Sequence, residues 1–162
     1  MTVNARSEAV RRRLLRPWNF RLYLWARLPL AACAGLSLRR LDDTGCTVAL
    51  PGGWRTQNPF RSMYFAAQSM AAEMSTGAPA MMLAEGASAS VSMLVREVRG
   101  VFTRRIQGEA EFTFEDLAGM REAVDRAVAT GESESFVARS VGRNRDGGAA
   151  SEFEITWSFK RR

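Results

Sequence analysis

The sequence predicts an α+β protein in which helices cover one face of an antiparallel sheet. The clearest sign of a strand lies near the C-terminus, where Phe153, Ile155, Trp157 and Phe159 alternate with polar residues. The clearest sign of a covering helix is the segment 58–77, which is almost uncharged. The expected order is helix, two strands, long helix, two strands, short helix, two strands, which is typical of the α+β class.

The first expected element is an amphipathic helix over 18–28 that covers the edge of the fold. Residues 1–17 precede this helix, and the prediction allows them to be flexible. Contact between helix 18–28 and a membrane surface is the less favoured alternative. Arg27 and Pro29 interrupt the apolar run, which is too short for a signal peptide and too short and too charged to span a bilayer.

The long helix is expected over about 59–76. Asn58 suits the N-cap, Pro59 suits the first helical position, and Gly77 suits the position that ends a helix. Residues 79–86 are then expected to form a break.

The remaining elements are short. Strands are predicted over 34–41, 47–50, 88–98, 109–114, 135–141 and 153–159. A helix over 116–129 is predicted from apolar residues at helical spacing, namely Leu117, Met120, Val124 and Val128. The segment Asn144-Arg145-Asp146-Gly147-Gly148 signals a hairpin. All of these elements are assigned to a single domain, 1–162.

Composition restricts the chemistry. The 162 residues include no histidine, which excludes a Ser-His-Asp triad and His-ligated zinc. Cys33 and Cys46 have no metal-type spacing and favour a reducing, cytoplasmic location, although one disulfide stays open. Neither a metal nor a cofactor is expected.

The net charge of +6 comes almost entirely from arginine. Arginine binds phosphate through two hydrogen bonds at once, so a nucleotide-bearing ligand and nucleic acid are both conceivable. A GC-rich genome is the favoured explanation for most of these arginines. Because no aromatic-plus-basic RNA motif is present, we expect no nucleic-acid partner.

Glu73 is the one charged residue between Arg61 and Gly77. On a helical wheel of about 100° per residue, Ser62, Ser69, Glu73 and Thr76 fall within about 60° of one another. A single carboxylate on a largely apolar helix is either a well-satisfied structural acid or a working one.

Two segments of the long helix carry a resemblance to a known fold. They are Asn58-Pro59-Phe60-Arg61-Ser62-Met63-Tyr64-Phe65-Ala66-Ala67 and residues 70–77, supported by 101–110 and the final hairpin. On these residues the chain resembles a hotdog family catalogued only as a domain of unknown function and related to the phenylacetyl-CoA-type acyl-CoA thioesterases. The resemblance implies a curved antiparallel sheet wrapped around a long central helix, a homodimer with a dimer of dimers left open, and an acyl-CoA ligand.

The resemblance also implies which residues act. The family places Asn or Gln before the helix and Asp or Glu within it, and here Asn58 and Glu73 hold those places. A backbone N–H near the helix start polarises the thioester carbonyl, usually at a glycine after a histidine. Tyr64-Phe65 stand there in this chain, so the donor would be the Phe65 N–H. Glu73 would attack the carbonyl or activate water, and Asn58 is either a positioning group or a plain N-cap.

Further residues are expected to contact the substrate. Tyr64, Ser62 and Ser69 lie along the same segment, and Arg104 and Arg105 follow the strand where related proteins meet the CoA nucleotide, with a solvated turn as the alternative. The family's third position, a Ser or Thr beyond the helix, has three candidates here, Ser88, Ser90 and Ser92.

The expected function is therefore thioester hydrolysis at a dimer interface. Non-catalytic binding of acyl-CoA or lipid is the alternative, because the usual histidine and glycine are replaced. In a helix rising about 1.5 Å per residue, Asn58 and Phe65 lie roughly 22 and 12 Å from Glu73. Neither pair can act on one carbonyl within a chain, so two antiparallel helices related by a two-fold axis are expected to build the site.

Overall fold

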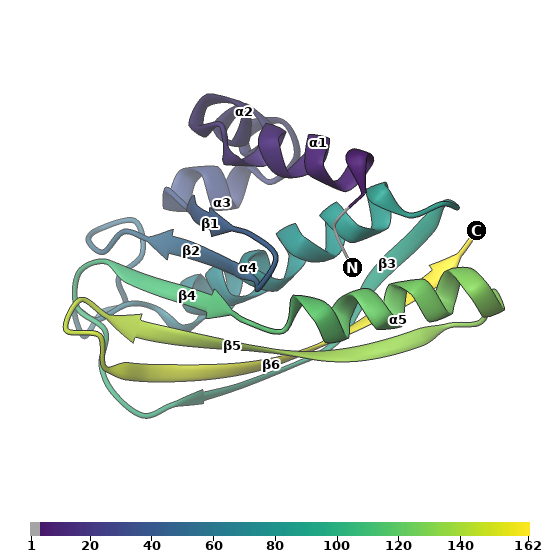
Figure 1. Cartoon of the computed structure of the whole chain (residues 1–162). Coiled ribbons are helices and arrows are strands. Elements are labelled where there is room, and N and C mark those ends of the chain that lie inside the picture. The colour runs from purple at the N-terminus through teal and green to yellow at the C-terminus, as the bar shows by residue number, and fades with distance from the viewer. Residues whose placement is uncertain (1–3) are drawn as a thin grey trace.

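The structure is a computed structural model that describes residues 4–162. Six strands form one antiparallel sheet in the order β1-β2-β4-β5-β6-β3 (Figure 1). The strands are β1 (Ser37–Leu41), β2 (Cys46–Leu50), β3 (Val91–Phe102), β4 (Ala110–Phe114), β5 (Glu134–Asn144) and β6 (Ala149–Arg161). The helices are α1 (Ala5–Leu15), α2 (Pro17–Arg27), α3 (Pro29–Ala34), α4 (Phe65–Gly86) and α5 (Leu117–Thr130).

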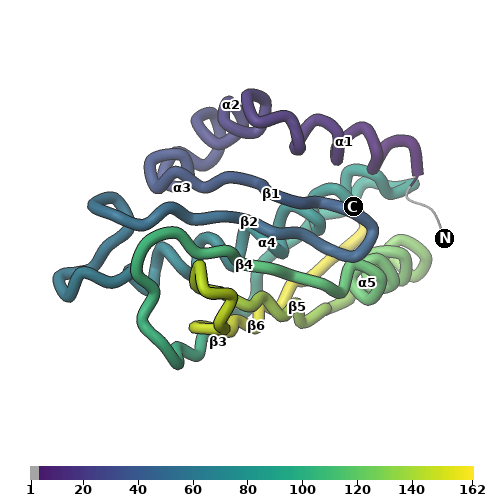
Figure 2. Tube along the Cα trace, turned by 60° about the vertical axis from the view of Figure 1, so that its left-hand side comes forward, coloured from purple at the N-terminus to yellow at the C-terminus, as the bar shows by residue number. Residues whose placement is uncertain are grey.

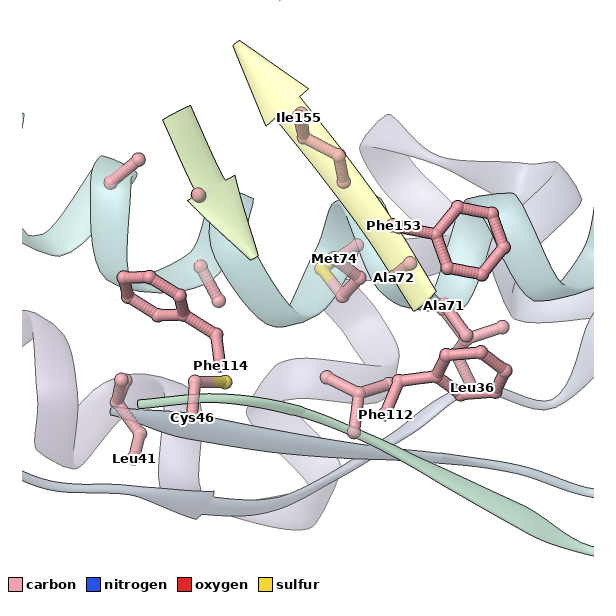
Figure 3. Close-up of a cluster of buried hydrophobic side chains, with 14 of the residues drawn as sticks. Leu36, Leu41, Cys46, Ala71, Ala72, Met74, Phe112, Phe114, Phe153 and Ile155 are labelled. Atoms are coloured by element: carbon pink, nitrogen blue, oxygen red, sulfur yellow. The ribbon is translucent and has the colours of Figure 1, made fainter. Parts of the chain in front are cut away.

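The sheet curves around α4, and the core lies between them. Figure 3 shows Phe112 and Phe114 of β4 and Phe153 and Ile155 of β6 around α4, which presents Ala71, Ala72 and Met74. These side chains are buried, and the two alanines let the sheet approach the helix closely. The prediction of an α+β hotdog fold, with a curved antiparallel sheet around a long central helix, is confirmed.

The bounds predicted for the long helix are wrong at both ends. Helix α4 begins at Phe65, with Tyr64 as N-cap, and continues through Gly77 and Pro79 to Gly86. Gly77 does not end the helix, and glycine stands there because a side chain has no room. A Cβ atom would lie 2.9 Å from Oε1 of Glu73 and 3.3 Å from the ring of Trp157. Pro79 removes one helical hydrogen bond, but the helix around it is buried on most sides, so packing sustains it.

The N-terminal region holds three helices where one was predicted, and α1 occupies most of the segment for which flexibility was left open. Residues 1–3 of that segment lie outside the described residues. Asn4 caps α1 by accepting a hydrogen bond from the Ser7 N–H (2.9 Å), and its Nδ2 donates to the carbonyl of Gly86 (2.6 Å). These bonds fix α1 to the end of α4. No helix in the described part of the chain is long and apolar enough to cross a membrane.

Strand β3 forms one edge of the sheet and contains a bulge. Val95 pairs with Trp157, whereas the next paired residue, Glu97, faces Thr156, so Arg96 is an extra residue. Before the bulge Met93 and Val95 face the inner side of the sheet, and beyond it Val98 and Phe102 do so. Their partners across β6 follow one continuous alternation.

Candidate functional site

The structure distributes the predicted site residues over two cavities of one chain. The first, of about 500 Å³, lies at the start of α4 and is lined by the predicted residues Asn58, Ser62, Tyr64, Phe65, Arg104 and Arg105. The second, of about 310 Å³, contains Glu73. Ser69 lines neither cavity and donates its hydroxyl to the carbonyl of Phe65 (2.9 Å). Ser88, Ser90 and Ser92, the three candidates for the third family position, also line neither cavity.

Hydrogen-bond donors are available at the start of α4. The N–H groups of Phe65, Ala66 and Ala67 have no acceptor among the described residues, and the N-cap side chain provides none. The first N–H groups of a helix carry partial positive charge. They are therefore suited to an oxygen that becomes negative during a reaction.

Gln68 is a polar residue of this cavity that the sequence analysis missed. Its Nε2 donates to the carbonyl of Met63 (3.1 Å), while its buried Oε1 has no partner. A buried amide oxygen without a partner is uncommon, because burial costs it the hydrogen bonds of water. The available signal was an amide within the otherwise apolar run that follows Tyr64.

Asn58 is not the N-cap of α4, and this corrects the sequence prediction. Its Oδ1 accepts hydrogen bonds from the N–H of Phe60 (3.0 Å) and from the N–H (3.1 Å) and hydroxyl (3.2 Å) of Ser62. It thereby holds a loop in which Arg61 has a φ of 58°. The Asn58 Nδ2 remains the group that can donate to a ligand. The estimate of roughly 22 Å to Glu73 no longer applies, because the residues from Asn58 to Tyr64 are not helical.

The two arginines at this cavity differ. Arg104 forms an ion pair with Asp146 (3.1 Å) across the final hairpin. The exposed side chain of Arg105 makes no ion pair or hydrogen bond among residues 4–162. Arg105 is therefore the better placed of the two to bind a phosphate.

Glu73 lies in a cavity that is otherwise mainly apolar. Helices α1 and α2, helix α4 and strands β3 and β6 all contribute to its wall, through Leu14, Phe20, Tyr23, Met74, Met81, Met93, Val95 and Trp157. The Glu73 carboxylate makes no hydrogen bond or ion pair with any described residue. Burial raises the pKa of Glu73. A carboxyl group in this state can bind and release a proton closer to neutral pH than an ordinary glutamate.

Tyr23 is the second residue that the sequence analysis missed. Burial raises its pKa, and the charge of Glu73 raises it further. Its hydroxyl lies 3.5 Å from Sδ of Met81. The proximity of Tyr23 to Glu73 could not be predicted from the sequence, because α2 and α4 are far apart in the chain.

We expect Glu73→Gln to stabilise the protein at pH 8 and to have little effect at pH 4. A raised pKa means that the folded state holds the proton more tightly than the unfolded state. The stability that this one carboxyl group contributes is therefore fully present below its ordinary pKa of 4.5 and is lost as the pH rises through the folded pKa. Glutamine cannot ionise, so the variant avoids this loss. Thermal unfolding of both proteins at the two pH values measures it, and each kcal/mol gained raises Tm by roughly 2–4 °C. Equal Tm values at pH 8 would contradict the raised pKa.

Neither a protein-family model nor a curated protein matches this chain. Solved structures do match it. Protein OLEI01261 of unknown function from Chlorobaculum tepidum has a TM-score of 0.76 and 12% identity, covering 91% of this chain and 98% of its own. PA5026 from Pseudomonas aeruginosa, described as a probable thioesterase, has a TM-score of 0.72 and 18% identity, covering 90% and 97%. A mutant of the thioesterase PA1618 from the same organism has a TM-score of 0.66 and 18% identity, covering 88% and 94%.

At these identities the likeness concerns the fold. It extends over 88–91% of this chain and 94–98% of the three similar chains.

Proposed function

We propose that this protein hydrolyses acyl-CoA thioesters at a site shared between two subunits. The observation that carries the proposal is the separation of two complementary groups on α4. Free N–H donors lie at its start, and a carboxylate without a partner lies roughly 12 Å further along the helix. A second copy of α4 in antiparallel orientation joins the two. Two of the structurally similar proteins, the probable thioesterase PA5026 and the thioesterase PA1618, support the same class of reaction.

The chemistry needs a base or nucleophile and a donor to the carbonyl oxygen. Glu73 of one subunit would activate water or attack the thioester carbon, and its raised pKa makes the carboxylate a stronger base than that of an ordinary glutamate. The Phe65 N–H of the partner would stabilise the negative oxygen. Asn58 would orient the carbonyl or the water through its Nδ2.

The edge strand β3 supports the dimer. Beyond the bulge, Val98 and Phe102 face the inner side of the sheet and are exposed, as are Tyr64 and Phe65 beside them. The rings of Phe65 and Phe102 are in edge contact, with centroids 6.4 Å apart. An unpaired edge next to exposed aromatic residues is a liability in a monomer. Pairing two β3 strands about a two-fold axis would remove the free edge and cover these side chains. A further association of two dimers stays open.

The cavities also indicate how the substrate would lie. The apolar cavity at Glu73, of about 310 Å³, would take the acyl group, and its volume favours an acyl group of modest size. Arg105 would contact a phosphate of CoA, and Tyr64 and Ser62 would line the approach of the thioester. We place this activity in the cytoplasm, as the two free cysteines suggest.

Non-catalytic binding of acyl-CoA is the second candidate. Tyr64 and Phe65 are large and exposed, and their rings contact each other with centroids 4.8 Å apart. These two rings leave a thioester less space to reach the Phe65 N–H, which favours binding without hydrolysis.

A hydrolysis screen separates the two candidates. Short, aromatic and long acyl-CoAs are incubated with the protein, and release of free CoA is followed with a thiol reagent. Binding of the same compounds is measured by calorimetry. We expect hydrolysis to be fastest for the acyl groups that fit the Glu73 cavity. Binding without release of thiol would favour the second candidate, and neither binding nor release would reject both.

A further inference from the structure

Helix α2 has two faces with different surroundings. On the inner face Phe20 and Leu24 are buried. On the outer face Trp18, Leu22 and Trp25 are 77%, 67% and 52% exposed. The spacing of four and then three residues puts these three side chains on one side of the helix. Figures 1 and 2 both show α2 at the margin of the molecule, next to α1 and α3.

Positive charge surrounds this outer apolar face. Between Glu8 and Asp42 the sequence has eight arginines and no Asp or Glu. The side chains of four of these arginines are exposed and make no ion pair or hydrogen bond among residues 4–162, namely Arg12, Arg16, Arg21 and Arg27. At about 100° per residue, Arg21 lies on the same side of α2 as the three apolar side chains, whereas Arg27 lies on the opposite side. The outer face therefore combines large apolar side chains with the Arg21 cation, and the other three uncompensated cations lie at neighbouring positions of the chain.

A groove lies next to the Glu73 cavity. It is lined by residues of α1, α2 and α4, has a volume of about 830 Å³, and carries Arg13, Arg27 and Glu85 on its wall, where Glu85 forms an ion pair with Arg13 (3.1 Å). Leu14, Tyr23 and Leu28 line both the groove and the Glu73 cavity. Leu22 of the outer face also lines this groove, so the outer face of α2 lies close to the Glu73 cavity.

We infer that α2 binds the surface of an anionic lipid bilayer. Trp18, Leu22 and Trp25 enter the interfacial layer, and the arginines contact the lipid head groups. Tryptophan favours the boundary between head groups and acyl chains, and amphipathic helices with apolar and basic residues lie in that plane. Anionic head groups attract clustered arginines. This binding goes beyond the proposed hydrolysis and does not require it.

A second copy of the chain fits the same face less well. A two-fold interface would place two identical faces against each other, and each carries unpaired arginines. Like charges brought together in this way oppose association. A bilayer with anionic lipid offers the opposite charge.

Vesicle co-sedimentation tests the inference. The full chain is mixed with vesicles of phosphatidylcholine alone, or of phosphatidylcholine and phosphatidylglycerol in a three-to-one ratio. We expect binding to the anionic vesicles, weaker binding as salt is added, and little binding to the neutral ones. For the triple variant Trp18→Ser, Leu22→Ser, Trp25→Ser, the affinity for anionic vesicles should fall by about tenfold or more. The change concerns exposed side chains, so circular dichroism should show an unchanged fold.

A control variant carries the same kind of change elsewhere. Trp54→Ser with Val137→Ser removes two side chains that are 84% and 56% exposed and lie outside α2. It should bind vesicles as the wild type does. Absence of wild-type binding to anionic vesicles, or equal binding by the triple variant, would overturn the inference. Loss of the dimer in the triple variant, without vesicle binding by the wild type, would assign the face to a subunit interface instead.

Discussion

Replacing Glu73 with glutamine should lower acyl-CoA hydrolysis by about a hundredfold or more, the size of effect typical for loss of a general base. Glutamine has nearly the same shape, so the cavity among Gly77, Met74 and Trp157 should keep its form. The amide can neither accept the proton of an attacking water nor attack the thioester carbon. The measurement is the rate of thiol release at saturating substrate, with the fold checked by thermal unfolding.

Glu111→Gln is the matched control. Glu111 lies on β4, its side chain is exposed, and it makes no ion pair or hydrogen bond among the described residues. This variant should retain wild-type hydrolysis. A folded Glu73→Gln protein with wild-type turnover would rule out a catalytic carboxylate at this position.

Mixing two inactive variants should restore about a quarter of wild-type activity. One variant is Glu73→Gln. The other is Asn58→Asp, which keeps the Oδ1 that holds the loop at Ser62 but loses the Nδ2 donor. In a mixed dimer one shared site has both residues intact and the other has both changed. Random exchange makes about half of the dimers mixed, and half of their sites are active.

The complementation experiment needs proof that subunits exchange. Differently tagged proteins, purified on one tag and detected by the other, supply it. Remixing Glu73→Gln with itself should restore nothing. If mixed dimers form and activity stays absent, although each variant is folded and inactive alone, the site does not lie between subunits.

Most of the sheet could be predicted because strand signals are local. A strand was predicted over 109–114 and β4 spans Ala110–Phe114, since Ala110, Phe112 and Phe114 alternate toward the core. Helix α5 was also predicted, because its apolar residues repeat at helical spacing, and the structure adds Asp116 as its N-cap. These residues encode their element within a few neighbours.

The ends of α4 and the N-terminal helices could not be predicted in this way. Asn58 and Gly77 match the usual start and stop residues, but each has another task. Asn58 holds a loop, and Gly77 leaves space for Glu73 and Trp157. Part of the wall of the Glu73 cavity comes from α1 and α2. The contact of these two helices with α4 depends on tertiary packing rather than on local sequence. The shared site and the roles of Ser62, Tyr64 and Arg104 stay predictions.

The extra residue in β3 has an evolutionary consequence. Side chains in a strand alternate between two faces, so losing one residue normally turns one half of the strand over. Losing Arg96 or its neighbour Glu97 would instead leave a regular strand in which Val95 and Val98 still face inward. A deletion at Met93 or Gly100 would expose apolar residues on one side and bury charged ones. The bulge is thus the place where this edge can shorten by one residue during divergence without inverting the face that it presents.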